Sequence, residues 1–151
     1  MKFRYLFYTI LVRFVLSVSL SSIYAEDATV GTSTFTVPDD FSAYNMTENI
    51  TMLTNENYTN VIYIVEGDVN SSEGKSNLLN KGYRLLDESD YVTDGGIHIH
   101  QENYRKDRFF SCLYAFEINN KSYLVTYTLP VGAYIPEDME NPVSKIMDTL
   151  K

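Results

Sequence analysis

The sequence contains a single cysteine, Cys112, and no tryptophan. One cysteine excludes an internal disulfide. The sequence also lacks a glycine-rich phosphate loop, a Cys-x-x-Cys pair and a Gly-x-Ser-x-Gly turn, each typical of an enzyme class. Because no complete catalytic set is present, we expect a protein that is not an enzyme and needs no cofactor. Hydrophobic residues make up 44% of the chain, which is typical of a packed globular domain.

Basic residues are scarce beside acidic ones. The 151-residue chain has 12 Lys and Arg against 20 Asp and Glu, a formal net charge of −8. Lys2, Arg4 and Arg13 fall in residues 1–25, which hold no acidic residue, so residues 26–151 retain 9 basic and 20 acidic residues and a formal charge of −11. Binding to nucleic acid or to an anionic membrane surface depends on cationic side chains, so we expect neither as a partner. A cationic partner or a divalent metal is compatible with this charge.

The first 25 residues follow the plan of a secretory signal peptide. Lys2 and Arg4 form a basic start, apolar residues dominate up to Leu20, and Ala25 ends a stretch with small residues where cleavage would fall. Arg13 interrupts the apolar run, whereas a membrane-spanning helix needs about 20 apolar residues. We therefore predict an exported protein, secreted or associated with the cell surface. An uncleaved N-terminal anchor is the alternative, and the only membrane contact that we expect.

Five Asn-x-Ser/Thr triplets offer acceptor sites for N-glycosylation. A chain rich in Asn, Ser and Thr produces such triplets by chance, but the predicted export signal gives them weight. A bulky glycan must lie on the surface, so each acceptor is expected to be exposed. The candidate residues are Asn45, Asn49, Asn57, Asn70 and Asn120.

Residues 109–129 give the strongest structural signal. Two runs rich in β-branched and aromatic residues are separated by Asn119 and Asn120, which tolerate positive φ. This pattern predicts an antiparallel hairpin. Counting outward from the turn places four pairs on one face: Phe116 with Tyr123, Tyr114 with Val125, Cys112 with Tyr127, and Phe110 with Leu129.

The other segments predict a single α+β domain over residues 34–151, preceded by a linker at 26–33. Further strands are expected at 34–37, 50–54, 60–65, 83–93 and 97–104. A weaker helix is predicted at 70–82, where Gly82 can end it. Asn141 and Pro142 are typical of a helix start, and the apolar residues that follow recur on one face: Val143, Ile146, Met147 and Leu150. We expect an antiparallel sheet of about six strands flanked by helices, with the C-terminal amphipathic helix packed on it.

This order of elements resembles the PsbP-like and Mog1-like group of α-β-α sandwich domains. The resemblance rests on residues 35–41 (FTVPDDF), 91–97 (YVTDGGI), 120–127 (NKSYLVTY) and 146–151 (IMDTLK). The Val-Pro-Asp opening and the many Asn-x-Thr triplets also make the chain similar to small exported proteins of methanogenic archaea. The resemblance covers most of residues 34–151. It implies a sandwich fold and an accessory or binding role outside the cytoplasm, and it transfers no catalytic residue because that group shares none.

His98, His100 and Glu102 form the sharpest local cluster of reactive side chains. At positions i, i+2 and i+4 of a strand they project from one face. Two imidazoles and a carboxylate suit zinc or another first-row metal, with an open position as in catalytic zinc sites. The alternative, which the frequency of surface histidines favours, is the polar face of a half-buried strand.

Three other groups of residues have simpler structural explanations. Cys112 falls in the predicted apolar face, where a free thiol packs as a small hydrophobe and is inert. The acidic run at 87–94 does not match the spacing of a calcium loop, and it predicts a solvated strand edge. The basic loop at 104–109 suits a polar loop, or contact with an acidic group of a partner, better than a nucleic-acid site.

These observations lead to three functional hypotheses. The first is an exported, non-enzymatic binding or accessory domain for an unknown protein or small-molecule ligand at the cell surface. The second is a metal-binding protein or metal-dependent hydrolase centred on His98, His100 and Glu102. The third is a structural cell-surface component that associates through an uncovered sheet edge.

Overall fold

The computed structural model describes residues 26–67, 71–132 and 141–151. The predicted signal peptide or anchor at 1–25 lies outside these residues, as does the candidate acceptor Asn70. The described chain is mostly antiparallel β-sheet with two helices, which fits the α+β class. Within this part of the chain, no helix is both long enough and apolar enough to span a membrane.

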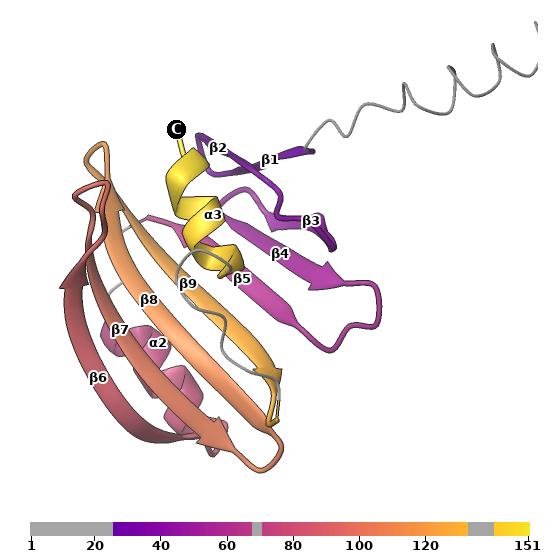
Figure 1. Ribbon diagram of the computed structural model, residues 1–151, viewed down its shortest axis with the longest axis vertical. Coiled ribbons are helices and arrows are strands. Elements are labelled where there is room, and N and C mark those ends of the chain that lie inside the picture. The colour runs from indigo at the N-terminus through magenta and orange to yellow at the C-terminus, as the bar shows by residue number, and fades with distance from the viewer. Residues whose placement is uncertain (1–25, 68–70, 133–140) are drawn as a thin grey trace, which may run out of the picture.

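Seven strands form one antiparallel sheet in the order β3-β4-β5-β9-β8-β7-β6 (Figure 1). Their bounds are β3 Phe41–Thr47, β4 Ile50–Asn55, β5 Val61–Glu66, β6 Arg84–Val92, β7 His98–Lys106, β8 Phe109–Ile118 and β9 Lys121–Pro130. The expected number of about six strands is too low, because no pattern in the sequence predicts β3. This strand lies at a sheet edge and is largely exposed, so it lacks the apolar pattern that identifies β5.

The segment 26–33, predicted to be a linker, instead belongs to a two-stranded sheet. Strand β1 (Asp27–Val30) pairs antiparallel with β2 (Ser33–Thr36) through a tight turn at Gly31, whose φ is +57°. Val30 is completely buried in the main core. Since Val30 is the one large apolar residue of β1, the strand is too short and too polar for a periodic signal to appear in the sequence.

The central hairpin confirms its predicted register. Phe116 pairs with Tyr123, and the three further predicted pairs also form. The turn residues Asn119 and Asn120 have φ of +54° and +61°. The rings of Phe116 and Tyr123 stack with their centroids 5.5 Å apart. This side of β8 and β9 belongs to the main hydrophobic core.

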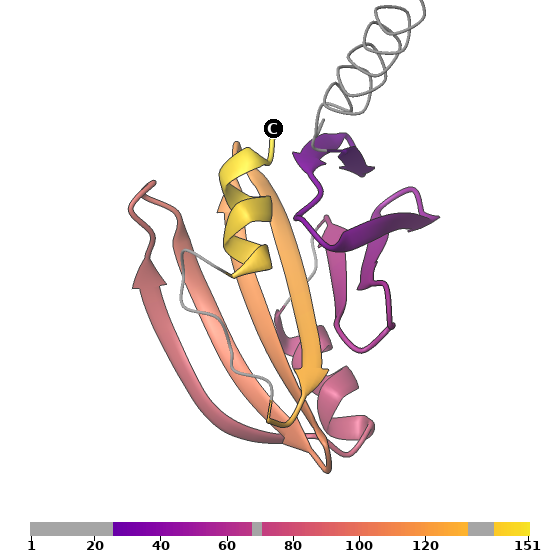
Figure 2. The same cartoon turned by 45° about the vertical axis from the view of Figure 1, so that its right-hand side comes forward.

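The two helices lie on opposite faces of the sheet (Figures 1 and 2). Helix α3 (Pro142–Thr149) and the residue that follows it bury the predicted apolar stripe in the main core. Asn141 caps the helix, since its Oδ1 accepts a hydrogen bond from the Val143 backbone N at 3.0 Å. The predicted C-terminal helix is therefore confirmed, including its start and the face that it buries.

Helix α2 (Ser71–Asn80) covers the other face, where Leu78 packs in a smaller core with Tyr104, Leu113 and Leu124. Gly82 has φ of +85° just beyond the helix, as the predicted end requires. A Cβ at Gly74 would stand 2.9 Å from the Leu124 Cδ2 atom, so glycine lets α2 approach the sheet closely.

Candidate functional site

The face of β7 beneath α2 carries an alternating row of polar side chains. His100, Glu102 and Tyr104 follow one another on this face, because alternate strand residues project to the same side. The edge strand β6 supplies the cross-strand partners, with Asp90 opposite His100 and Glu88 opposite Glu102. A cluster of ionisable groups therefore lies between α2 and the β6 edge.

Glu102 is the buried centre of this cluster, with only 3% of its surface exposed. Its Oε1 accepts hydrogen bonds from Lys75 Nζ of α2 at 3.2 Å and from His100 Nε2 at 3.3 Å. Its Oε2 accepts a hydrogen bond from the hydroxyl of the completely buried Tyr104. Burial alone raises the pKa of the carboxyl, but the hydrogen bonds from Tyr104, Lys75 and His100 outweigh it and leave the pKa below 4.5. Glu102 is therefore held as a carboxylate. We call these residues, together with Asp90, the Glu102 network.

His100 bridges two carboxylates. Its Nδ1 lies 2.8 Å from Asp90 Oδ1, and its Nε2 faces Glu102. The hydrogen bond to Asp90 raises the pKa of His100 most strongly, burial lowers it, and the bond to Glu102 raises it again, so the pKa lies above 6.5. The two neighbouring carboxylates thus favour the positively charged imidazolium form of His100.

The structure brings together two of the three predicted metal ligands and replaces the third. Ligand atoms of Glu88, His100 and Glu102 lie within 4.8 Å of one another, whereas His98 is not in this group. His98 lies two residues nearer the β6–β7 turn, where it pairs with Val92, and its side chain is exposed. Glu88 enters instead because the antiparallel register places it directly opposite Glu102.

The donor set of this group fits a divalent cation, since two carboxylates and an imidazole are common ligands of zinc and manganese. Lys75 already supplies a positive charge there: its Nζ lies 3.2 Å from Glu102 and 3.8 Å from Glu88. A metal ion would therefore have to displace the Lys75 ammonium and the proton that His100 favours. Without a metal, the same contacts attach α2 to the edge of the sheet.

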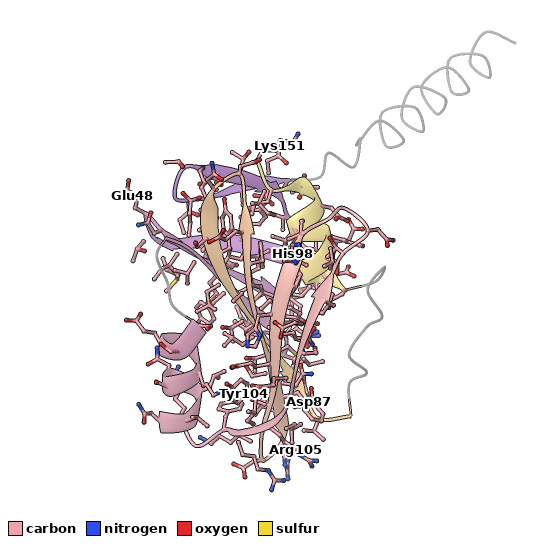
Figure 3. The ribbon with its side chains drawn as sticks, turned by 90° about the vertical axis from the view of Figure 1, so that its left-hand side faces the viewer. Glu48, Asp87, His98, Tyr104, Arg105 and Lys151 are labelled. Atoms are coloured by element: carbon pink, nitrogen blue, oxygen red, sulfur yellow. The ribbon has the colours of Figure 1, made fainter. Side chains whose placement is uncertain are left out.

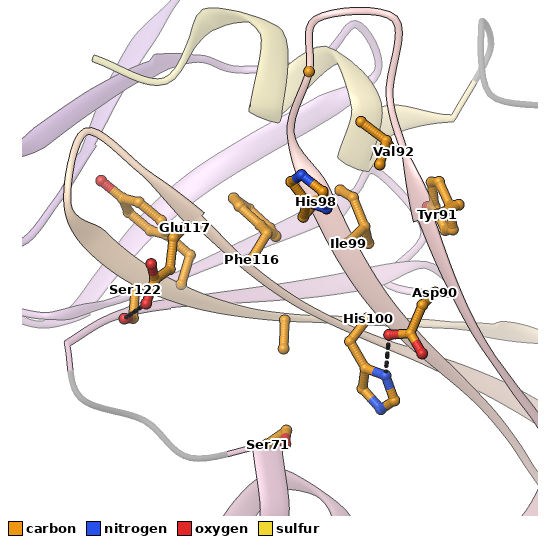
Figure 4. A pocket seen from close by; sticks show the side chains of 13 residues that line it. Ser71, Asp90, Tyr91, Val92, His98, Ile99, His100, Phe116, Glu117 and Ser122 are labelled. Atoms are coloured by element: carbon orange, nitrogen blue, oxygen red, sulfur yellow. Dashed lines mark hydrogen bonds and ion pairs between the residues drawn. The ribbon is translucent and has the colours of Figure 1, made fainter.

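Beyond the N-terminal end of α2, both histidines line an open cleft of about 670 Å³ (Figure 4). We call it the histidine cleft. Asp90 and Glu117 contribute carboxylates, and Glu117 accepts a hydrogen bond from the Ser122 hydroxyl at 3.2 Å. The apolar and aromatic lining comes from β6, β7, β8 and β9 and consists of Tyr91, Val92, Ile99, Ala115, Phe116 and Tyr123. Ser71 and Gly96 complete the lining, so no lysine or arginine is among the described lining residues.

The remaining candidate residues lie where the sequence pattern places them. Cys112 is buried, and burial raises the pKa of its thiol to about 11, so it is an inert core residue. The acidic run lies on or next to β6, which is an exposed edge strand. Among the candidate glycan acceptors in the described residues, all are exposed: Asn45, Asn49, Asn57 and Asn120.

The sequence pattern does not identify four members of the site, Lys75, Glu88, Asp90 and Tyr104. Asp90 and Glu88 had a usable signal: counting outward from the Asp94-Gly95-Gly96 turn places them opposite His100 and Glu102. Lys75 gives no such signal, because its place depends on how α2 packs across the sheet.

No family model matches the chain, and no curated protein matches it. A crystal structure of a protein from Bacteroides thetaiotaomicron is similar to it with a TM-score of 0.45 and 15% sequence identity. The match covers 82% of this chain and 46% of the other, so this chain spans less than half the length of that protein.

Proposed function

We propose that the protein is an exported, non-enzymatic binding domain whose ligand occupies the histidine cleft. The observation that carries the proposal is the cleft itself. Its volume of about 670 Å³ is in the range of ligand sites, and it combines an apolar lining with a few polar groups. The signal-like segment at 1–25 and the four exposed glycan acceptors support export to the cell surface. Helices α2 and α3 on opposite faces of the sheet fit the sandwich arrangement that the resemblance to PsbP-like and Mog1-like domains implies.

The charges around the cleft favour a ligand with a cationic group on an apolar stem. Asp90 and Glu117 are the acidic residues of the cleft lining. Protonated His100 competes with a cationic ligand for the Asp90 carboxylate. An amine or guanidinium would pair with the carboxylates while its carbon stem packs on Val92 and Ala115, which project from the same face of the sheet. Such a ligand should bind more tightly as pH rises and His100 loses its proton.

The test is an NMR titration of the ¹⁵N-labelled chain with spermidine and with a short Lys/Arg peptide. The amide signals of the cleft residues should shift, and Asp90→Asn or Glu117→Gln should weaken binding at least about fivefold, since each removes a charge that pairs with the ligand. Asp148→Asn, an exposed carboxylate on α3, is the matched control. Shifts that avoid the cleft, or equal affinities in all three variants, would contradict the proposal.

A second candidate function is divalent-metal binding by Glu88, His100 and Glu102, which the grouping of their ligand atoms within 4.8 Å favours. Thermal melts with chelator and then with zinc, manganese or calcium test it. A metal at about 100 times its dissociation constant should add roughly 2.7 kcal/mol to the free energy of unfolding. Lys75→Met should strengthen the effect by removing the competing ammonium.

The choice between Glu88 and His98 as the third ligand decides which metal hypothesis holds. Glu88→Gln should abolish the metal-induced shift, while His98→Gln should leave it unchanged. The reverse result would restore the ligand set predicted from the sequence. Identical melts with and without every metal would remove metal binding altogether.

A further inference from the structure

Five of the nine basic residues in 26–151 gather at the end of β7 away from the histidine cleft. They lie on the segment before β6 and on the β6–β7–β8 strands and turns, and we call this surface the basic end. His98 and Arg105 mark the two ends of β7 in Figure 3. The members of the basic end are Lys81, Arg84, Arg105, Lys106 and Arg108.

Two of these arginines are neighbours on adjacent strands. Arg84 and Arg105 are direct partners in the antiparallel β6–β7 pair. Like charges at such a position repel each other and destabilise the pairing. Within the described part of the chain, the ion pairs shorter than 4.0 Å involve Lys75, His100, Lys121 and Lys145, and none involves the basic end. In the described part of the chain, no carboxylate therefore forms an ion pair within 4.0 Å with a residue of the basic end.

Aromatic rings hold two of the cations in place. The Arg105 guanidinium carbon lies 5.6 Å from the centre of the Phe110 ring, and Lys106 Nζ lies 5.8 Å from the centre of the Tyr83 ring. Lys106 also donates a hydrogen bond to the Lys81 backbone carbonyl. Side chains held in this way lose less conformational freedom when a ligand binds.

These cations border an open pocket of about 370 Å³, lined by Gly82, Arg84, Arg105, Lys106 and Asp107. Asp107 is its one acidic lining residue, so the pocket has an excess of positive charge on a chain whose residues 26–151 carry a formal charge of −11. Repulsion of an anion by distant carboxylates is screened over about 8 Å at physiological ionic strength. Salt screens the direct pairing of a guanidinium with an oxyanion much less, because the two groups are in contact and form two parallel hydrogen bonds.

We propose that the basic end is a binding site for an oxyanion ligand, a molecule that carries carboxylate, sulfate or phosphate groups. Arg84 and Arg105 bind the anionic group between them, and Lys106 supplies a third charge at the pocket. The bound anion removes the Arg–Arg repulsion. This site is separate from the histidine cleft, so either proposal can fail without the other.

The experiment uses the full chain and three probes in isothermal titration: inorganic sulfate, dextran sulfate and unsubstituted dextran. Dextran sulfate should bind and unsubstituted dextran should not. If the natural ligand is a polymer, inorganic sulfate should bind more weakly than dextran sulfate. If the natural ligand is a free oxyanion, the affinity per sulfate group should be the same for both probes. Arg84→Gln combined with Arg105→Gln should weaken dextran sulfate binding at least about tenfold, because two charge-assisted contacts are lost.

Two controls separate this site from general charge effects and from unfolding. Lys145→Gln removes one positive charge on α3 and should leave binding unchanged. Arg105→Lys keeps the charge but not the bidentate geometry, and it should weaken binding by an intermediate factor. Because the double glutamine variant also removes the contact of Arg105 with Phe110, a thermal melt identifies the temperatures at which it is folded, and binding is compared there. Absent binding of dextran sulfate, or equal loss in the double variant and Lys145→Gln, would overturn the proposal.

Discussion

Replacing Glu102 by glutamine tests whether the Glu102 network stabilises the fold. The wild-type carboxylate accepts hydrogen bonds from Lys75, His100 and Tyr104, whereas the glutamine amide offers one acceptor oxygen to the same three donors. Lys75, whose side chain is 36% exposed, can turn towards water, so its loss costs little. The buried Tyr104 hydroxyl cannot reach water, and a buried donor without a partner costs about 1–3 kcal/mol.

Adding the lost charge-assisted bond from His100, we expect Glu102→Gln to lower the free energy of unfolding by about 2–3 kcal/mol at pH 7. Urea unfolding followed by circular dichroism, with unchanged dependence on urea concentration, measures this difference. Glu117→Gln is the matched control, because Glu117 is exposed and accepts one described hydrogen bond, from Ser122. Its effect should stay within about 0.5 kcal/mol.

The pH dependence of the same difference provides the refuting result. Since the pKa of Glu102 is lowered by folding, the stabilisation by its charge is fully present above about pH 4.5 and is lost as pH falls through the lower folded-state pKa. The gap between wild type and Glu102→Gln should therefore shrink as pH falls below 4.5, whereas between pH 7 and 5 it also follows the protonation of His100, whose pKa Glu102 raises. A gap that is negligible at pH 7, or that does not change on acidification, would show that the network does not hold Glu102 as a stabilising carboxylate.

Three further predictions concern the turn before β2, the cap of α3 and the charge on His100. Gly31→Ala should lower the free energy of unfolding by about 2 kcal/mol, because the new Cβ at φ +57° would stand 2.6 Å from the Glu66 carboxylate; urea unfolding measures the loss. Asn141→Ala should cost about 1 kcal/mol by removing the cap of α3, again by urea unfolding. Asp90→Asn should lower the pKa of His100, because the hydrogen bond that His100 donates to Asp90 is the main cause of its raised pKa; an NMR titration of the imidazole signals follows the change.

The first two predictions have control variants, and the third has a result that contradicts it. Gly95→Ala adds a Cβ whose nearest contact is 3.7 Å away at an ordinary φ, and it should be neutral. Asn141→Asp retains an oxygen for the cap and should be milder than alanine unless the contact of Asn141 with the Tyr114 hydroxyl dominates. An unchanged His100 titration in Asp90→Asn would show that the Nδ1 contact does not set its charge.

Strong local patterns were sufficient to predict the hairpin β8–β9 and helix α3. The two asparagines fix the turn, so one count outward gives the register, and Asn141 with Pro142 marks the start of the helix. The edge strand β3 and the strand β1 were missed for a common reason. A largely exposed strand and a four-residue strand bury too few apolar side chains to produce a period in the sequence.

The candidate site was predicted in part, and the error follows from the same limits. Alternation along β7 correctly places His100 and Glu102 on one face, but it cannot measure which neighbours come within bonding distance. The third candidate ligand, Glu88, comes from β6, and the ammonium of Lys75 comes from α2, which packs on this face of the sheet. Contacts between elements depend on packing, which a local pattern does not contain.

The position of β9 in the sheet governs when the protein can fold during synthesis. Strands β3 to β5 and strands β6 to β8 form two separate meanders, and only β9 pairs with both, through β5 on one side and β8 on the other. Val61 of β5 pairs with Thr128 of β9, so this edge of β5 stays unpaired until β9 has been synthesised. Until residues 121–130 emerge, each half presents an open edge to other chains. The sheet is therefore completed only after most of the chain has been synthesised. A nascent chain that stays unfolded until β9 is available avoids pairing its open strand edges with those of another chain.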